Sequence, residues 1–223
     1  MTWHHFLSRQ SQSNSSSLRE TRLQLEQLET RHLLSAEPFL IDIDLGGNSS
    51  PRQMTEVNGT VFYSAVDIEH GRELWMTDGT SEGTQFVKDI HPGTEDSTPI
   101  DLINANGILY FIANDGVHGA ELWITDGTAE GTRLVKDLKT GSNSSSPSTL
   151  VSMGDNQAFF ANADSIGASL WLTDGTEEGT ILIQALNEQS NDSFTQSYRL
   201  ANLNGTLFFF SEYCFLRQRV MEE

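Results

Sequence analysis

Hydrophobic residues recur along this chain in short runs, and the whole pattern repeats at an interval of 48 residues. In the second copy the runs are DLINA (101–105), ILYFIA (108–113), AELWIT (120–125) and TRLVKDL (132–138). The first copy predicts strands near 53–57, 60–65, 72–77 and 84–90, and the third copy repeats them. Four runs with short links predict an antiparallel meander of four strands in each copy.

Turn residues separate the runs in the same places each time. Asn58-Gly59, Asn106-Gly107 and Asn204-Gly205 are tight hairpin signals, because both residue types tolerate positive φ. Two Gly between the third and fourth runs are expected to supply left-handed positions as well. The second run of each copy is almost continuously apolar, as in a sheet covered on both faces. The predicted fold is all-β, a β-propeller or partial propeller of four-stranded blades, with a solenoid of β-coils as the alternative.

Three regions differ in composition. Residues 1–36 join a polar Ser/Gln/Asn-rich stretch to a leucine-bearing amphipathic stretch, which predicts a disordered segment and a short helix. Residues 37–212 carry the blades, and 213–223 form a tail without the repeat pattern. The run FLIDIDL (39–45) aligns with a fourth strand, and fifteen strands are expected in all. Because the tail lacks the Trp and Gly of a third strand, an open series of blades is favoured over a closed ring.

The chain is strongly acidic, with 31 Asp and Glu against 13 Lys and Arg and a net charge of −18. Residues 1–38 contain four charges of each sign, so the excess lies in 39–223. Such a surface repels nucleic acid and anionic lipid, which excludes a nucleic-acid partner. No run approaches the 18 or so apolar residues of a membrane-spanning helix. A single cysteine, Cys214, excludes an internal disulfide framework.

The twelve-residue segments at 73–84, 121–132 and 169–180 read ELWMTDGTSEGT, ELWITDGTAEGT and SLWLTDGTEEGT. They resemble the bacterial ELWxxDGT repeat, also labelled "hyalin-like", over about residues 40–210. Ser169 departs from the pattern, where the other copies have Glu. The matching motif residues are Trp75, Asp78, Gly79, Thr80, Trp123, Asp126, Gly127, Thr128, Trp171, Asp174, Gly175 and Thr176. The resemblance implies a large secreted or surface repeat protein and supplies no activity.

A second resemblance concerns the segment LEQLETRHLLSAEP before the blades. It is similar to the N-terminal LEPR-XLL signature of large secreted bacterial proteins, although Thr30 stands where that signature has proline. The resemblance implies a role in export or surface sorting. An ordinary N-terminal helix is the alternative reading.

Candidate metal ligands are few. Each Asp-Gly-Thr motif offers a single carboxylate, so an Asp that caps its own turn is favoured over a calcium ligand. Asp42 and Asp44 form a D-x-D pattern but align with a strand end. His70 and His118 occupy the same loop position, where the third copy has Ile166. Neither has a second histidine three to five residues away, as a zinc site usually requires. No metal site, cofactor or catalytic residue is predicted.

The remaining chemistry is equally sparse. Cys214 has no neighbour that would lower its pKa, and no GxSxG, HExxH or phosphate-binding glycine loop occurs. The repeated tryptophans are expected in the core between blades, with stacking on sugars as the alternative. The sequence therefore predicts a non-enzymatic extracellular or cell-surface protein for adhesion or scaffolding through acidic loops. The alternatives are a lectin-like sugar- or peptide-binding module and the noncatalytic part of a secreted hydrolase.

Overall fold

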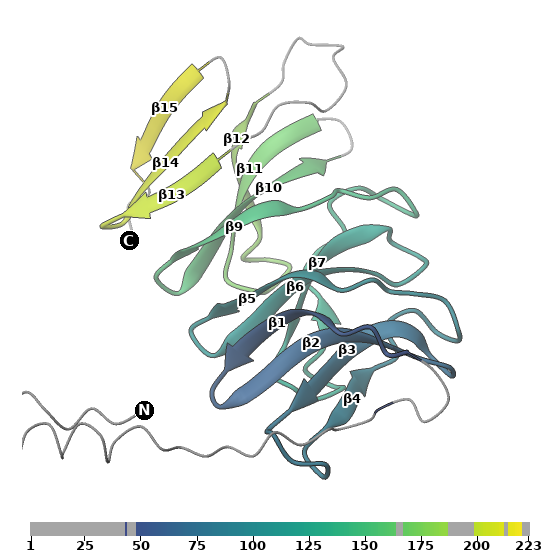
Figure 1. The fold of residues 1–223 in the computed structure, drawn as a ribbon. Coiled ribbons are helices and arrows are strands. Elements are labelled where there is room, and N and C mark those ends of the chain that lie inside the picture. Colours follow the sequence, from purple (N-terminus) through teal and green to yellow (C-terminus); the bar gives the residue numbers. More distant parts are fainter. Residues whose placement is uncertain (1–42, 44–47, 164–166, 187–198, 212–213, 220–223) are drawn as a thin grey trace, which may run out of the picture. The chain divides into compact units, whose positions relative to one another are not determined.

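The computed structural model describes residues 43, 48–163, 167–186, 199–211 and 214–219. Within these residues it contains fifteen β-strands and no helix, so this part of the chain is all-β (Figure 1). The helix expected in residues 1–36 lies outside the described residues. So does the strand expected at 39–45, apart from Ile43.

The strands form four sheets, which we call blades 1 to 4 in chain order. Blade 1 contains β1 (Arg52–Val57), β2 (Thr60–Asp67), β3 (Gly71–Thr77) and β4 (Gln85–Lys88). Blade 2 contains β5 (Ile100–Ala105), β6 (Ile108–Asn114), β7 (Ala120–Thr125) and β8 (Arg133–Leu134). Blade 3 contains β9 (Ser148–Met153), β10 (Asn156–Ala163), β11 (Gly167–Thr173) and β12 (Ile181–Ala185). Blade 4 contains β13 (Arg199–Leu203), β14 (Thr206–Ser211) and β15 (Cys214–Arg219).

Every blade is an antiparallel meander in which each strand pairs with the next one along the chain. The register is the same in each copy: Tyr63 faces Trp75, as Phe111 faces Trp123. The strands expected from the hydrophobic runs are present in blades 1 to 3. The fourth run of the second copy, 132–138, forms only the two-residue strand β8.

The tail contradicts its sequence-based interpretation in one respect. Residues 214–219 form β15, which pairs with β14 and occupies the position of a third strand. The expectation that the tail cannot supply this strand is wrong, because backbone pairing needs neither the Trp nor the Gly of the motif. The pairing of the tail with 39–45, which would close a ring, involves residues outside the described part.

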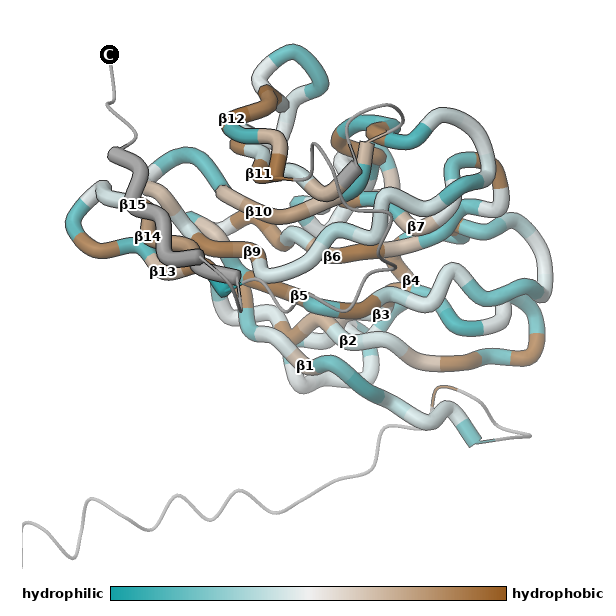
Figure 2. Tube along the Cα trace, turned by 90° about the horizontal axis from the view of Figure 1, so that it is seen from above, coloured by the Kyte–Doolittle hydropathy of each residue, from teal (hydrophilic) through white to brown (hydrophobic). Residues whose placement is uncertain are grey.

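Each blade has two apolar faces. The leading face carries the tryptophan in blades 1 to 3 and carries Leu207 and Phe209 in blade 4. The trailing face carries the alternate positions of the same strands, since successive side chains point to opposite sides of a sheet. In blade 1 the leading face includes Tyr63 and Trp75, and the trailing face includes Phe62 and Leu74. In Figure 2 the hydrophobic residues follow the strands, and hydrophilic residues predominate in the loops.

Successive blades bury these faces against each other. The trailing face of blade 1 and the leading face of blade 2 form one core, with Phe62 and Leu74 beside Phe111 and Trp123. A second core joins blades 2 and 3, and a third joins blades 3 and 4. One type of interface is thus repeated three times within the chain.

Candidate functional site

The Asp-Gly-Thr turn between the third and fourth strands is built identically in blades 1 to 3. In blade 2, Asp126 Oδ1 accepts hydrogen bonds from Thr128 N at 2.9 Å and Thr128 Oγ1 at 2.8 Å. Thr128 Oγ1 in turn accepts from Gly131 N at 2.9 Å. Thr132 Oγ1 donates to Thr128 O at 2.6 Å. The same bonds recur around Asp78 and Asp174. These carboxylates therefore cap their own turns.

The two glycines of the turn serve different purposes. Gly79, Gly127 and Gly175 adopt positive φ of 88° to 95°, as the sequence suggests. Gly131 does not have positive φ, so the expectation of a second left-handed position is wrong. Its role is to leave space, because a Cβ atom there would overlap the carboxylate of Asp126. Gly83 and Gly179 lie in the same way against Asp78 and Asp174.

The three repeated tryptophans lie in the cores. Trp75, Trp123 and Trp171 are only 6 to 8% exposed. Trp123 packs in the core between blades 1 and 2, and Trp171 in that between blades 2 and 3. Their ring faces are therefore covered by neighbouring side chains, which leaves little surface for stacking on a sugar.

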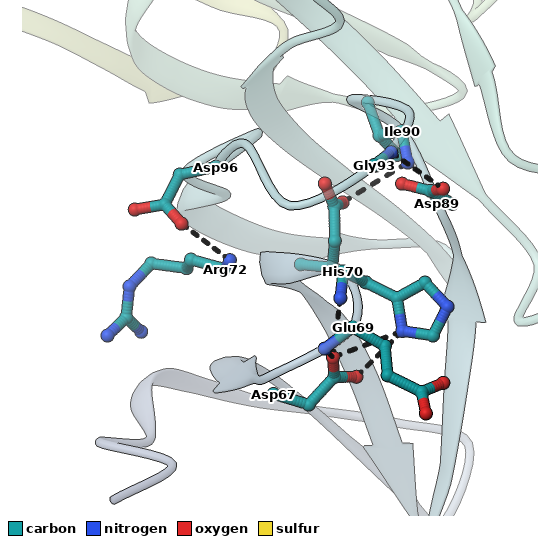
Figure 3. Close-up of polar contacts among 9 residues, drawn as sticks. Asp67, Glu69, His70, Arg72, Asp89, Ile90, Gly93 and Asp96 are labelled. Carbon is teal, nitrogen blue, oxygen red and sulfur yellow. Dashed lines mark hydrogen bonds and ion pairs between the residues drawn. The ribbon is translucent and has the colours of Figure 1, made fainter. Parts of the chain in front are cut away.

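In blades 1 and 2, a buried glutamate at the start of the ELW motif ties the blade to the connection that follows it. Glu73 is fully buried and accepts hydrogen bonds from Ile90 N at 3.2 Å, His91 N at 3.1 Å and Ser97 Oγ at 2.5 Å. Figure 3 shows Ile90 and Gly93 in this connection, close to Asp89. Ser97 O also accepts from Asn114 N in blade 2 at 2.9 Å. The carboxylate of Glu73 thus helps to join blade 1 to blade 2.

Blade 2 repeats this arrangement with Glu121. Its carboxylate accepts from Ser145 N at 2.8 Å and from Ser145 Oγ, while Ser145 O accepts from Asn162 N in blade 3 at 2.8 Å. Burial raises the pKa of both Glu73 and Glu121 to about 7, against the opposing effect of these hydrogen bonds. In blade 3, Ser169 replaces the glutamate, and its following connection lies outside the described residues.

The loop between the second and third strands holds an Asp–His pair in blades 1 and 2. Asp67 Oδ2 lies 2.9 Å from His70 Nδ1, and Asp115 Oδ2 lies 2.7 Å from His118 Nδ1. The hydrogen bond to Asp67 raises the pKa of His70. Burial acts to raise the pKa of Asp67, but the bonds from His70 and Glu69 together hold it below its ordinary value. Figure 3 shows Asp67 and His70 facing one another in blade 1. Each pair lies three residues apart in the chain and so fastens its own loop.

The other candidates do not assemble into a site. Among the described residues, no group of three His, Cys, Asp or Glu side chains could hold a metal ion. Asp42, Asp44, His4, His5, His32 and Ile166 lie outside the described part of the chain. Cys214 begins β15, and only its backbone is described. No helix in the described part is long and apolar enough to cross a membrane.

No protein-family model matches this chain, and no curated protein matches it significantly.

Sequence reasoning missed the residues that connect the blades. Lys88 Nζ donates to Thr132 O at 2.7 Å, and Lys136 Nζ donates to Thr180 O at 3.0 Å. Asn58 Nδ2 donates to Gly107 O at 3.2 Å, across the same interface as Lys88. The recurrence of these Lys and Asn positions at the repeat interval was the available signal. Their partners lie in another blade, which one copy of the repeat does not reveal.

Proposed function

We propose that this chain is a non-enzymatic extracellular or cell-surface protein that serves adhesion or scaffolding, with its blades arranged as in a β-propeller. The observation that carries the proposal is how the repeated polar residues are used. The Asp and Thr of each turn bond to one another, and Glu73 and Glu121 bond to the connections between blades. These hydrogen bonds give the repeated Asp, Thr and Glu residues a structural role. A partner protein therefore binds the exposed residues around the motif.

Each Asp-Gly-Thr loop of blades 1 to 3 exposes acidic side chains. Glu82, Glu130 and Glu178 are exposed at equivalent positions, and Glu177 adds another in blade 3. The loop of blade 3 lies against the preceding blade, because Lys136 Nζ, two residues after β8, donates to the Glu177 carbonyl at 3.2 Å. A row of carboxylates at neighbouring loops favours a cationic partner, such as a basic protein surface.

Binding to poly-L-lysine at several salt concentrations tests this role. The variant Glu82→Gln/Glu130→Gln/Glu178→Gln is expected to lose at least tenfold in affinity, and the wild-type affinity is expected to fall with salt. The matched control Glu69→Gln/Glu95→Gln/Asp101→Asn removes three exposed charges elsewhere and should lose much less. Equal losses in both variants would show that overall charge, not the loop row, attracts the partner.

The lectin-like alternative predicts a different result. Because the tryptophans are buried, a sugar would have to bind other loop residues. A glycan array with the full chain separates the two classes: specific retention of one glycan, insensitive to salt, would favour the lectin-like module over the acidic adhesion surface.

A further inference from the structure

Two large apolar side chains are exposed on the first and last blades. Met54 in blade 1 is 66% exposed, and Leu203 in blade 4 is 61% exposed. Both occupy positions of the repeat that are at least partly covered in every other blade. Each therefore marks a part of a blade face that a neighbour covers in the other blades and that the described residues leave exposed here, although Ile43 packs near Trp75 on the same face of blade 1.

Met54 belongs to the leading face of blade 1. The equivalent residue of blade 2, Leu102, is 7% exposed and lies in the core shared with blade 1. Leu150 and Leu200 pack in the same way in blades 3 and 4. In blade 1 the position opens on an apolar groove of about 190 Å³, lined by Met54, Ile43, Ser49, Pro51, Val61, Tyr63, Thr77 and Thr84. The groove lies where blades 2 to 4 receive a neighbour.

Leu203 belongs to the trailing face of blade 4. The equivalent residues Val57, Ala105 and Met153 are 4 to 6% exposed, and each lies in the core shared with the following blade. At all three described interfaces this residue shares a core with the residue equivalent to Met54. Leu203 and Met54 are thus the two unmatched halves of a contact that the chain makes three times.

The polar residues beside Leu203 and Met54 also have counterparts in the contacts between other blades. The asparagine of the β1–β2 turn, Asn58, donates to Gly107 O in the next blade, and Asn106 donates to Gly154 O at 2.6 Å. Asn204 occupies the same turn position in blade 4, one residue after Leu203. Its counterpart acceptor in blade 1 is a carbonyl of the same turn, Gly59 by analogy with the bond of Asn58 or Asn58 by analogy with that of Asn106.

A contact between blade 4 and blade 1 would lack one hydrogen bond that is made between other blades. Asn104 Nδ2 donates to Glu56 O in the preceding blade at 2.9 Å, and Asn202 Nδ2 donates to Ser152 O at 2.8 Å. The equivalent residue in blade 1 is Glu56, whose carboxylate cannot donate a hydrogen bond. Blade 3 has Ser152 there, which donates to Gly154 O within its own blade. The interface between blades 2 and 3 forms without this bond, so its loss weakens an interface and does not prevent one.

We infer that the trailing face of blade 4 docks onto the leading face of blade 1 of a second copy of this chain. Leu203 enters the groove beside Met54, and Asn204 donates to a carbonyl of the Asn58–Gly59 turn. The partner is a second copy because both side chains are exposed within one chain, and no described strand of blade 4 pairs with blade 1. The contact joins two different faces, so it extends head to tail into rings or longer assemblies. This inference does not depend on the proposed adhesion.

Sedimentation of the full chain over a wide concentration range tests the inference. The wild-type protein is expected to show a weight-average mass that rises above that of one chain with concentration. Met54→Asp and Leu203→Asp each place a charge on one of the two apolar faces and are expected to weaken association at least tenfold. Because both residues are exposed, neither change should impair folding, which a thermal melt checks. Val117→Asp, also 61% exposed but in a loop, is the matched control and should associate like the wild type.

Mixing the two variants gives the sharpest readout. A Met54→Asp chain keeps Leu203 and a Leu203→Asp chain keeps Met54, so an equimolar mixture should form dimers although each variant alone does not. A wild-type protein that stays at the mass of one chain would overturn the inference. If both variants then also melted earlier than the wild type, the two faces would meet within one chain. Association that survives in both variants would place the contact elsewhere.

Discussion

At the residue scale, the repeated motif divides into side chains that fill the core and side chains that fix loops. Trp123 belongs to the first kind, since it is 6% exposed and packs against blade 1. Asp126 and Thr128 belong to the second, since their bonds stay within one turn. A substitution should therefore act on the packing of two blades in the first case and on a single loop in the second.

Trp123→Ala is expected to reduce the free energy of unfolding by about 3–5 kcal/mol, the usual cost of deleting a buried aromatic side chain. Urea denaturation measures it, with Val117→Ala at an exposed loop position as the control. A loss below about 1 kcal/mol would mean that the indole does not contribute to the core, and would reopen the question of sugar stacking.

Glu121→Gln is expected to change how stability depends on pH. Burial raises the pKa of Glu121 to about 7, above the ordinary value of 4.5. The protonated acid is therefore favoured in the fold, and its contribution is complete below about pH 4.5 and lost as the pH rises through 7. Glutamine carries no charge to bury, so the variant should lose less stability between pH 5 and 8.

Urea denaturation at four pH values across that range provides the measurement. The bond to Asp115 raises the pKa of His118, whose contribution also falls with rising pH, and the charge of Glu121 adds to that shift. Glu121→Gln removes this part of the shift, so His118 also makes the slope of the variant smaller. Glu130→Gln, at an exposed position, should keep the wild-type slope. Identical slopes for wild type and Glu121→Gln would contradict the prediction.

At the scale of elements, the hydrophobic runs and turn residues predicted the strands of blades 1 to 3 closely. This worked because each strand is buried on both faces and each hairpin has its own Asn-Gly or Gly-containing turn. The strand β15 was not predicted, because its position depends on pairing with β14 and not on a local motif. The side-chain bonds between blades were missed for the same reason, as their partners lie 41 or more residues away in the chain.

Lys136→Met is expected to lower the free energy of unfolding by about 1–3 kcal/mol, since it removes charged hydrogen bonds to two carbonyls in blade 3 while keeping the aliphatic stem. The control is Lys139→Met, whose side chain lies outside this contact. Chemical denaturation compares the two. If both variants lose equally little, the lysine bridge does not stabilise the interface.

At the scale of the whole molecule, the charge excess in residues 39–223 opposes folding through repulsion among like charges. Raising NaCl from about 10 to about 150 mM shortens the screening length from about 30 to about 8 Å, so the melting temperature should rise by several degrees. The variant Glu82→Gln/Glu130→Gln/Glu178→Gln should show a smaller rise, measured by differential scanning calorimetry. A melting temperature that falls with salt would show that attractive ion pairs outweigh the repulsion.

The neutral charge balance of residues 1–38 sets the start of the chain apart from this acidic body, and residues 41–223 form a unit of their own. Deleting residues 1–36 is therefore expected to leave the melting temperature of the blades within about 2 °C of the wild type, since surface changes away from the core cost little.

If the LEPR-XLL resemblance reflects sorting, the same deletion should move the protein from the surface or medium into the cell. Fractionation of cells that express both forms, with Trp123→Ala as a control for destabilisation alone, separates the two effects. An unchanged location would argue against sorting, and a much earlier melt would show that residues 1–36 support the blades.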